Sequence, residues 1–354
     1  MNYLITRITY FSIIPILFLM GCSQTSVLME SDPEQEVSEP DYTIVVYIHG
    51  DSDYLFHDGD GNRTEADQHA LSKAMDIAVN AGSGEVFVYH HQPAKRFLWM
   101  IPRRTNELYH FINGEKVRHI KYRRSSDELF LQTEADFFQK HSISQNKDHQ
   151  AYFVYFGHEI PEKNYKGYHQ SQSDIVVDTE TFARGAQSFL DSDDALFDLM
   201  VLSTCSNGTP AMVKQLSGIT NYLLASPLNL HLSYIDITSL KLLETNPQIS
   251  ANELATEIAE ESYDRLSDSI QTVISLSVYD INAVEEYVEN LLNRTLSYRE
   301  AENPNPFYEN IDCAELSFFD QEKFTSGVQT FFRPARFGHR SSGNSHSGWG
   351  CKGD

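Results

Sequence analysis

The chain has 354 residues, of which 41% are hydrophobic, so it can bury a sizeable core in one large or two modest domains. Its formal net charge is −23, with 27 lysines and arginines against 50 acidic residues. This balance argues against nucleic acid as a partner, because phosphate binding requires clustered basic side chains. The acidity is explained more simply by solubility and by repulsion between copies.

The first 22 residues resemble the signal peptide of a bacterial lipoprotein. Arg7 precedes the apolar run "ITYFSIIPILFLMG", which is short for a membrane span and suits the apolar region of a signal peptide. The run ends in "LMGC" (19–22), which resembles a lipobox. The resemblance implies that Cys22 is lipidated and is the chain's one attachment to a membrane. We therefore expect an anchored protein of the bacterial cell envelope, at the outer membrane, the periplasmic face or the cell surface; an ordinary secretory signal is the alternative.

Residues 23–41 predict a disordered acidic tether, since they carry six acidic residues, no basic residue and two prolines. We expect the folded domain to span 42–336 and a Gly/Ser-rich tail to span 337–354.

Five short apolar runs predict buried strands. Their continuous rather than alternating apolar character is typical of strands covered on both faces of a parallel sheet. The runs are 42–48, 85–91, 151–157, 198–204 and 221–226. Helix-like stretches lie between or after them, at 65–82, 125–142, 178–192, 209–218, 251–266 and 282–294. This alternation predicts an α/β fold with a mostly parallel sheet flanked by helices on both faces. Asn113-Gly114, between two β-like runs, also predicts a hairpin.

Two residues whose side chains can take part in catalysis follow successive predicted strands. His158 comes after the strand at 151–157 and Cys205 after the strand at 198–204, 47 residues later. Neighbouring parallel strands lie about 4.8 Å apart, so their final loops can bring an imidazole close to a thiol. A histidine can stabilise a thiolate for attack on an acyl carbon and then protonate the leaving amine. Neither residue type is diagnostic alone, because free cysteines are often buried in cores.

The remaining cysteines suggest one disulfide. With Cys22 lipidated, an oxidising compartment holds Cys205, Cys313 and Cys351, and an odd number leaves at least one thiol unpaired. Pairing Cys313 with Cys351 is the simplest assignment.

The order of histidine and cysteine resembles the caspase–gingipain–legumain clan of cysteine peptidases, and within it the clostripain family, over about residues 42–320. Four stretches carry the family resemblance: "DSD" (51–53), "YLLASPLNLHLSYI" (222–235), "ISLSVYDINAVEEYVENLL" (274–292) and "YENIDCAELSFF" (308–319).

The resemblance implies a caspase-like fold and an endopeptidase that hydrolyses protein or peptide substrates. Cys205 would attack the scissile carbonyl to form a thioester, and His158 would assist thiolate formation and protonate the departing amine. The backbone N–H groups of Cys205 and Glu159 would form the oxyanion hole. No cofactor is required, although some relatives use calcium.

Two positions depart from the family pattern. Glu159 stands where the family usually has glycine, and Ser203 stands where an aspartate helps to recognise a basic side chain at the cleavage site. Ser203 is therefore a candidate substrate-binding residue. Asp236, in the loop after "LASPLNL", is a second candidate because it could supply an acid to the same pocket. Cleavage after a basic residue is one expectation. The alternative is a catalytically inactive surface lipoprotein that binds a peptide or a protein partner.

Other motifs offer competing interpretations. "YIHGD" (47–51) resembles the oxyanion segment of α/β-hydrolases, with His231 as a partner for Cys205, but the chain has no G-x-S-x-G elbow. "DGDGN" (58–62) resembles the start of a calcium loop but lacks the later ligands of an EF-hand. His90 and His91, with His49 or His57, suggest a metal cluster, although solvated loop histidines explain them more simply. We expect no metal ligands.

Overall fold

The computed structural model describes residues 39–352, with gaps at 52–54, 58–60, 93–94, 98–100, 104, 125–128, 145–148, 193, 233, 303–309 and 338–343. The expected signal peptide, Cys22 and most of the expected tether therefore lie outside the described residues. Among the residues that are described, no helix has the length and apolar character needed to span a membrane.

A nine-stranded sheet runs through the described part of the chain, in the order β16-β14-β13-β12-β9-β1-β4-β7-β8. Its five central strands are parallel and correspond to the five predicted runs: β1 (Tyr42–His49), β4 (Gly84–His91), β9 (Gln150–Phe156), β12 (Phe197–Ser203) and β13 (Thr220–Ala225). Antiparallel strands extend both edges: β7 (Asn106–Ile112), β8 (Glu115–Tyr122), β14 (Ile274–Asp280) and β16 (Val328–Arg333). The predicted α/β class with a mostly parallel sheet is confirmed.

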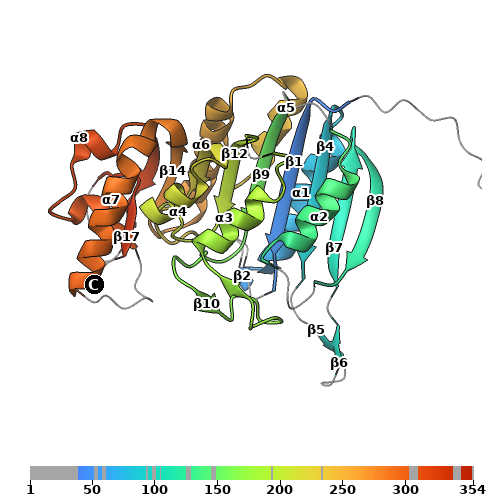
Figure 1. The fold of residues 1–354 in the computed structure, drawn as a ribbon, viewed down its shortest axis with the longest axis horizontal. Coiled ribbons are helices and arrows are strands. Elements are labelled where there is room, and N and C mark those ends of the chain that lie inside the picture. The colour runs from blue at the N-terminus through green and yellow to red at the C-terminus, as the bar shows by residue number, and fades with distance from the viewer. Residues whose placement is uncertain are drawn as a thin grey trace, which may run out of the picture. The chain divides into compact units, whose positions relative to one another are not determined.

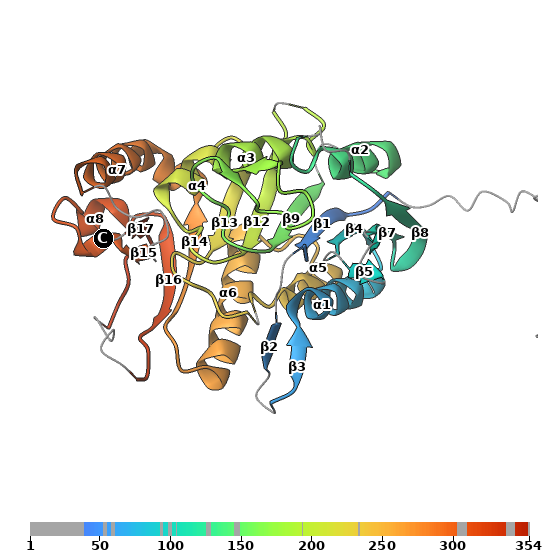
Figure 2. The ribbon, with the colours of Figure 1, turned by 90° about the horizontal axis from the view of Figure 1, so that it is seen from below.

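Helices cover both faces of the sheet, which explains the continuous apolar runs. Successive residues of β1 enter opposite cores: Val45 and Tyr47 pack in one apolar cluster, and Val46 and Ile48 pack in the other. One face carries α2 (Gln132–His141), α3 (Thr179–Gln187), α4 (Pro210–Leu216) and α7 (Ile281–Glu302), and the other carries α1 (Ala66–Asn80), α5 (Leu242–Thr245) and α6 (Ala251–Ser269), as Figure 2 shows. The remaining elements are β2 (Leu55–His57), β3 (Arg63–Glu65), β5 (Lys95–Phe97), β6 (Ile101–Arg103), β10 (Tyr165–Lys166), β11 (Val176–Val177), β15 (Asn310–Asp312), β17 (Gly350–Lys352), the 3₁₀ turns η1 (Thr238–Lys241) and η2 (Cys313–Glu315), and α8 (Gln321–Phe324).

Local sequence signals predict the hairpin of β7 and β8 at one edge of the sheet, but they do not predict β14 and β16 at the other edge. Asn113 and Gly114 have φ values of 52° and 78° and join β7 to β8, as a type I′ turn requires. Strands β14 and β16 were not among the predicted runs. Serines interrupt the apolar character of β14, and one of them, Ser277, pairs with Thr330 through their side-chain oxygens at 3.2 Å.

The last described residues of the expected Gly/Ser-rich tail over 337–354 enter the core. Trp349 is fully buried, and β17 pairs with β15. The predicted bridge between Cys313 and Cys351 is present and closes a loop with a sequence separation of 38 residues. Loop-closure entropy gives such a bridge about 4 kcal/mol of stabilisation. Burial of Trp349 and the disulfide therefore order this segment, although its glycines and serines favour flexibility.

Candidate active site

The sheet register brings the two predicted catalytic residues to one edge. In the parallel pair β9–β12, which lie side by side in Figure 1, Phe156 is the register partner of Ser203. His158 and Cys205 each follow two residues beyond that pair. The N–H of Gly157 still donates to the carbonyl of Ser203, at 3.3 Å, so the two chains leave the sheet together.

A buried asparagine ties the loop after His158 to the loop after Cys205. Asn207 Oδ1 accepts from the Ile160 N–H at 2.9 Å, and its Nδ2 donates to the Ile160 carbonyl at 2.8 Å. The Thr204 hydroxyl donates to the same Oδ1 at 2.6 Å. Because one rigid amide satisfies donor and acceptor of a single distant residue, it fixes the spacing of the two loops. The sequence around Asn207 is a short polar stretch after Cys205 that carries no sign of a partner at Ile160, so this role was not predicted.

A pair of buried tyrosines holds the backbone of His158. Tyr168 donates its hydroxyl to the His158 carbonyl at 2.9 Å, and its oxygen lies 3.0 Å from that of Tyr155. Tyr155 comes from β9 itself, so the strand that carries the histidine also supports the loop that fastens it. The sequence analysis missed this contact as well, since nothing near Tyr168 marks it as a partner of His158.

Cys205 is a partly buried free thiol. Burial raises the pKa of the thiol, and the nearby Glu159 carboxylate raises it further, whereas a backbone hydrogen bond at Leu230 opposes both. The Leu230 N–H donates to Sγ at 3.3 Å, and the thiol donates to the Leu230 carbonyl at 3.5 Å. Desolvation lowers the pKa of His158 to about 4, although the residue is exposed at the surface. At neutral pH the resting pair is therefore a thiol and a neutral imidazole.

The residue after the thiol has an unusual backbone conformation. Ser206 has a φ of 51°, in the left-handed region that non-glycine residues seldom adopt. Its N–H donates to the Leu228 carbonyl at 2.9 Å, and its own carbonyl accepts from Asn310 Nδ2 at 3.1 Å. Such conformations persist where surrounding bonds hold them, and they occur often at functional sites.

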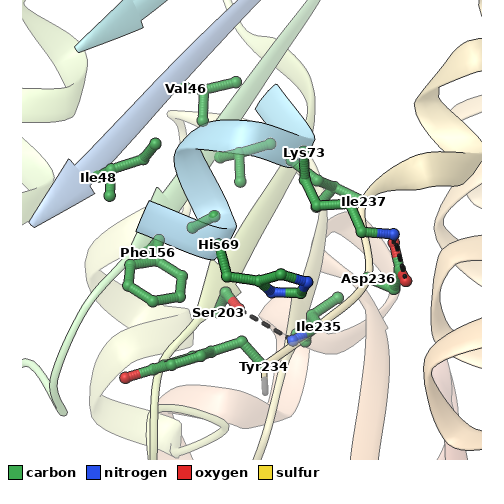
Figure 3. A pocket seen from close by; sticks show the side chains of 12 residues that line it. Val46, Ile48, His69, Lys73, Phe156, Ser203, Tyr234, Ile235, Asp236 and Ile237 are labelled. Carbon is green, nitrogen blue, oxygen red and sulfur yellow. Dashed lines mark hydrogen bonds and ion pairs between the residues drawn. The ribbon is translucent and has the colours of Figure 1, made fainter. Parts of the chain in front are cut away.

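A small cavity of about 30 Å³ lies beside these strand ends and contains both predicted substrate-binding residues. Ser203 accepts from the Ile235 N–H at 3.0 Å through its hydroxyl, as Figure 3 shows. The other walls are mainly apolar: Val46, Ile48, Ala70, Val154, Phe156 and Ile237. The structure thus brings Ser203 and Asp236, the two candidate substrate-binding residues, to one pocket.

The carboxylate of Asp236 already has basic partners. Lys73 Nζ lies 3.2 Å from Oδ2, and Arg265 Nε lies 3.6 Å from the same oxygen. Burial raises the pKa of Asp236, but hydrogen bonds from Thr238 and Lys73 outweigh burial and hold it below its ordinary value. Asp236 is therefore an ionised group whose charge is balanced within the protein.

The expectation of solvated loop histidines is wrong for His49, His90 and His91, which are buried and lie within β1 and β4 because these strands run deep into the sheet. The three histidines separate into different environments. His90 lies 3.0 Å from the Asp67 carboxylate, through Nε2. His49 and His91 lie together with a third ring, that of His169, and all three are buried. Burial, followed by the charges of neighbouring groups, lowers the pKa of both His49 and His169. The side chain of His57 and most of the acidic loop at 58–62 lie outside the described residues.

Solved structures show which known proteins share this fold. A secreted C11 cysteine protease from Bacteroides thetaiotaomicron, "iotapain", superposes with a TM-score of 0.56 and 11% identity over 89% of this chain and 94% of that one. The chain has the fold of a C11, clostripain-like cysteine protease. The fold implied by the resemblance is thereby confirmed.

Two further C11 structures are similar at TM-scores of 0.48. One is a secreted protease of Bacteroides thetaiotaomicron with an irreversible peptide inhibitor, at 14% identity over 72% of this chain and 68% of that one. The other is an inactive zymogen from Parabacteroides distasonis, at 12% identity over 73% and 66%. No protein-family model matches the sequence, and no curated protein matches it.

The environment of Cys205 predicts that its thiol reacts slowly with alkylating reagents. Because the pKa of Cys205 is raised, little thiolate exists at neutral pH, and alkylation by iodoacetamide should be slower than for an unstructured cysteine peptide and should accelerate as the pH rises. Glu159→Gln removes the nearby carboxylate, lowers the thiol pKa and should make alkylation at neutral pH several-fold faster. Peptide mapping of Cys205 by mass spectrometry measures both rates. Equal rates for Glu159→Gln and the unmodified chain would contradict the charge effect.

We call the side-chain amide of Asn207, which joins the loops after His158 and Cys205, the amide clamp. It should contribute more to the free energy of unfolding than an exposed asparagine nearby. Asn207→Ala removes three buried hydrogen bonds and should lower the free energy of unfolding by about 3 kcal/mol. Asn229, which is exposed and accepts from the Ser206 hydroxyl at 3.1 Å, provides the control Asn229→Ala, with an expected loss of at most about 1 kcal/mol. Urea unfolding monitored by circular dichroism measures both; equal losses would refute the clamp.

Proposed function

We propose that the protein is a cysteine endopeptidase in which Cys205 is the nucleophile and His158 the acid–base partner. The observation that supports this most strongly is the register of β9 and β12, which places the two residues at equal offsets beyond a paired position on a C11 fold. The clamp of Asn207 then holds their loops at a set separation.

The neutral resting pair determines how the reaction would proceed. A neutral imidazole at His158 accepts the proton of the Cys205 thiol as sulfur bonds to the scissile carbonyl carbon, so no preformed ion pair is required. The imidazolium then returns that proton to the departing amine, which leaves a thioester. Water, deprotonated by the same imidazole, attacks the thioester, releases the carboxylic acid and restores the thiol.

The oxyanion of the tetrahedral intermediate would receive hydrogen bonds from the backbone N–H groups of Cys205 and Glu159. Glu159 supplies this N–H as any residue other than proline does, but its carboxylate disfavours negative charge nearby. The charge of Glu159 would thus slow the reaction through the same effect that raises the thiol pKa.

The pocket favours a small uncharged side chain before the scissile bond. Its apolar walls and limited volume provide little room, and the carboxylate that could have attracted a basic side chain is balanced by Lys73 and Arg265. We therefore propose that this chain differs from the basic preference implied by its family resemblance.

The second candidate function is that of a non-catalytic binding protein on the same fold. The raised thiol pKa and the acidic residue at 159 favour it, because both oppose thiolate chemistry. In this role, the pocket would hold a side chain of a bound peptide without cleaving the chain.

Thiol-dependent peptide cleavage separates these two functions. The full chain should cleave members of a fluorogenic peptide library, Cys205→Ala should abolish cleavage, and His158→Ala should lower kcat by about 100- to 10,000-fold. Iodoacetamide pretreatment should abolish activity in parallel with modification of Cys205. If the folded chain cleaves no peptide, even with added calcium, the binding role is favoured instead.

Freeing the Asp236 carboxylate should change the specificity of the pocket. With peptides that carry Ala, Leu or Arg before the scissile bond, the native chain should prefer Ala. Lys73→Met removes the amine 3.2 Å from Asp236 and should raise kcat/KM for the Arg peptide about tenfold relative to Ala. Lys116→Met, on the exposed strand β8, is the control and should leave the ratio unchanged. A native preference for Arg would refute this specificity.

We further propose that Cys22 carries a lipid that anchors the protein in the cell envelope. The motif "LMGC" supports this, as described above. In bacteria fed radiolabelled palmitate, the native chain should be labelled and remain in the membrane fraction. Cys22→Ala should be unlabelled, and retention of label by this variant would contradict the anchor.

A further inference from the structure

Three buried histidines converge next to the candidate active site. His49 ends β1, and its register partner His91 ends β4, so the sheet places them side by side. His169 comes from the segment between β10 and β11. The ring centroids lie 5.5 Å apart for His49 and His91, 4.8 Å for His49 and His169, and 5.1 Å for His91 and His169. We propose that these three imidazoles bind a divalent transition-metal ion, with Zn²⁺ as the representative.

The separation of the ring nitrogens suits a single ion. Zinc lies about 2.0–2.1 Å from histidine nitrogen, so two nitrogens on a tetrahedral ion stand roughly 3.3 Å apart. His49 Nε2 and His169 Nδ1 are 2.9 Å apart, and one nitrogen from each of the three rings lies within 4.8 Å of the others. Modest ring rotations therefore suffice to form the site.

Backbone hydrogen bonds hold the three segments together independently of the rings. The Gly50 N–H donates to the His91 carbonyl at 2.7 Å, and the Gln170 N–H donates to the Asp51 carbonyl at 3.3 Å. The Ser171 N–H donates to Asp51 Oδ2 at 2.9 Å. A Cβ at Gly50 would lie 2.8 Å from the His91 carbonyl oxygen, so this close approach requires glycine. The ligand positions are thus preorganised, which lowers the cost of binding an ion.

The hydrogen bonds of the cluster do not satisfy its rings. His49 and His169 are fully buried, and their one mutual bond uses a single nitrogen of each. Whichever ring donates, one N–H and one lone pair are left over, and His49 Nδ1 and His169 Nε2 find no partner among the described residues. An ion between the rings would replace their mutual hydrogen bond, with His49 Nε2 and His169 Nδ1 both supplying lone pairs and the two other nitrogens carrying the protons.

The charges around the cluster suit a cation. Asp51 is fully buried, and its Oδ2 lies 3.8 Å from His91 Nε2, so a carboxyl group stands beside the three rings. The nearby Arg124 guanidinium is balanced by Glu134, with Nε and Oε2 at 3.5 Å. Imidazole ligands favour zinc, copper, nickel and iron over calcium and magnesium, which prefer oxygen. The site is therefore chemically distinct from the calcium loop considered at 58–62.

The ion would brace the loop that carries the candidate acid–base residue. His169 is adjacent to Tyr168, whose hydroxyl holds the His158 carbonyl. On the other side, a Cβ at Gly157 would lie 3.2 Å from the Cβ of His49. A metal bound by His49, His91 and His169 would therefore link the ends of β1 and β4 to the loop of Tyr168, and the His158 segment lies between His49 and Tyr168.

Metal binding is tested on the purified full chain, without any measurement of peptidase activity. After chelator treatment and dialysis, titration with ZnCl₂ in a calorimeter should show one ion per chain. His91→Gln and His169→Gln should each weaken binding by about 100-fold or more. His90→Gln alters a buried histidine next in sequence but outside the cluster and should bind zinc normally; Cys205→Ser and His158→Asn should also bind normally.

Cobalt provides a measurement that does not depend on variant folding. Co²⁺ bound to the native chain should give the visible d–d bands of a tetrahedral site without a near-ultraviolet thiolate band. Absence of stoichiometric zinc binding would overturn the proposal. So would binding that is lost in Cys205→Ser and retained in His169→Gln, or a thiolate band in the cobalt spectrum.

Discussion

The structure depends on the parallel pairing of β9 with β12. This pairing is internal to the sheet and buried on both faces, so a shift of one residue would expose apolar side chains to the wrong core. With Phe156 opposite Ser203, the two strands end at the same level and their loops begin together. The candidate dyad and the pocket lie at strand ends whose alignment this register sets, and the parallel pairing of β1 with β4 aligns His49 with His91 at the same edge of the sheet.

Beyond the strand ends, polar groups replace apolar packing as the means of holding the loops. Asn207 serves Ile160, Tyr168 serves His158, and Asp51 serves the segment after His169. Each bond joins one loop segment to another, across 10 to 120 residues of sequence. Desolvation at these loops then has a chemical effect, because it favours the neutral forms of Cys205 and His158 alike.

The sequence predicted the parts of this arrangement that depend on local pattern. Strands β1 and β9 are readable because burial on both faces leaves an unbroken apolar run, and the Asn113-Gly114 turn is readable because few residues tolerate its backbone. The positions of His158 after β9 and of Cys205 after β12 could be predicted because both strands are apolar runs of this kind. Asn207, His169 and Trp349 were missed because their partners are remote: a polar turn, a loop histidine and a Gly/Ser-rich stretch look alike whether solvated or buried. The charge balance around Asp236 was missed for the same reason, since Lys73 is brought to it by the fold.

The C-terminal strand places an oxidised bridge in the same small domain as a reduced thiol. Gly350 donates its N–H to the carbonyl of Gly208, at 2.8 Å, so β17 and Cys351 are built against the loop that begins at Cys205. Thiol–disulfide exchange requires a thiolate, and its rate falls as the thiolate fraction falls. Burial raises the pKa of Cys205 once the chain has folded, so the fraction of thiolate at this position stays low. The same burial that limits the reactivity of the resting thiol therefore also protects the bridge between Cys313 and Cys351 from exchange with it.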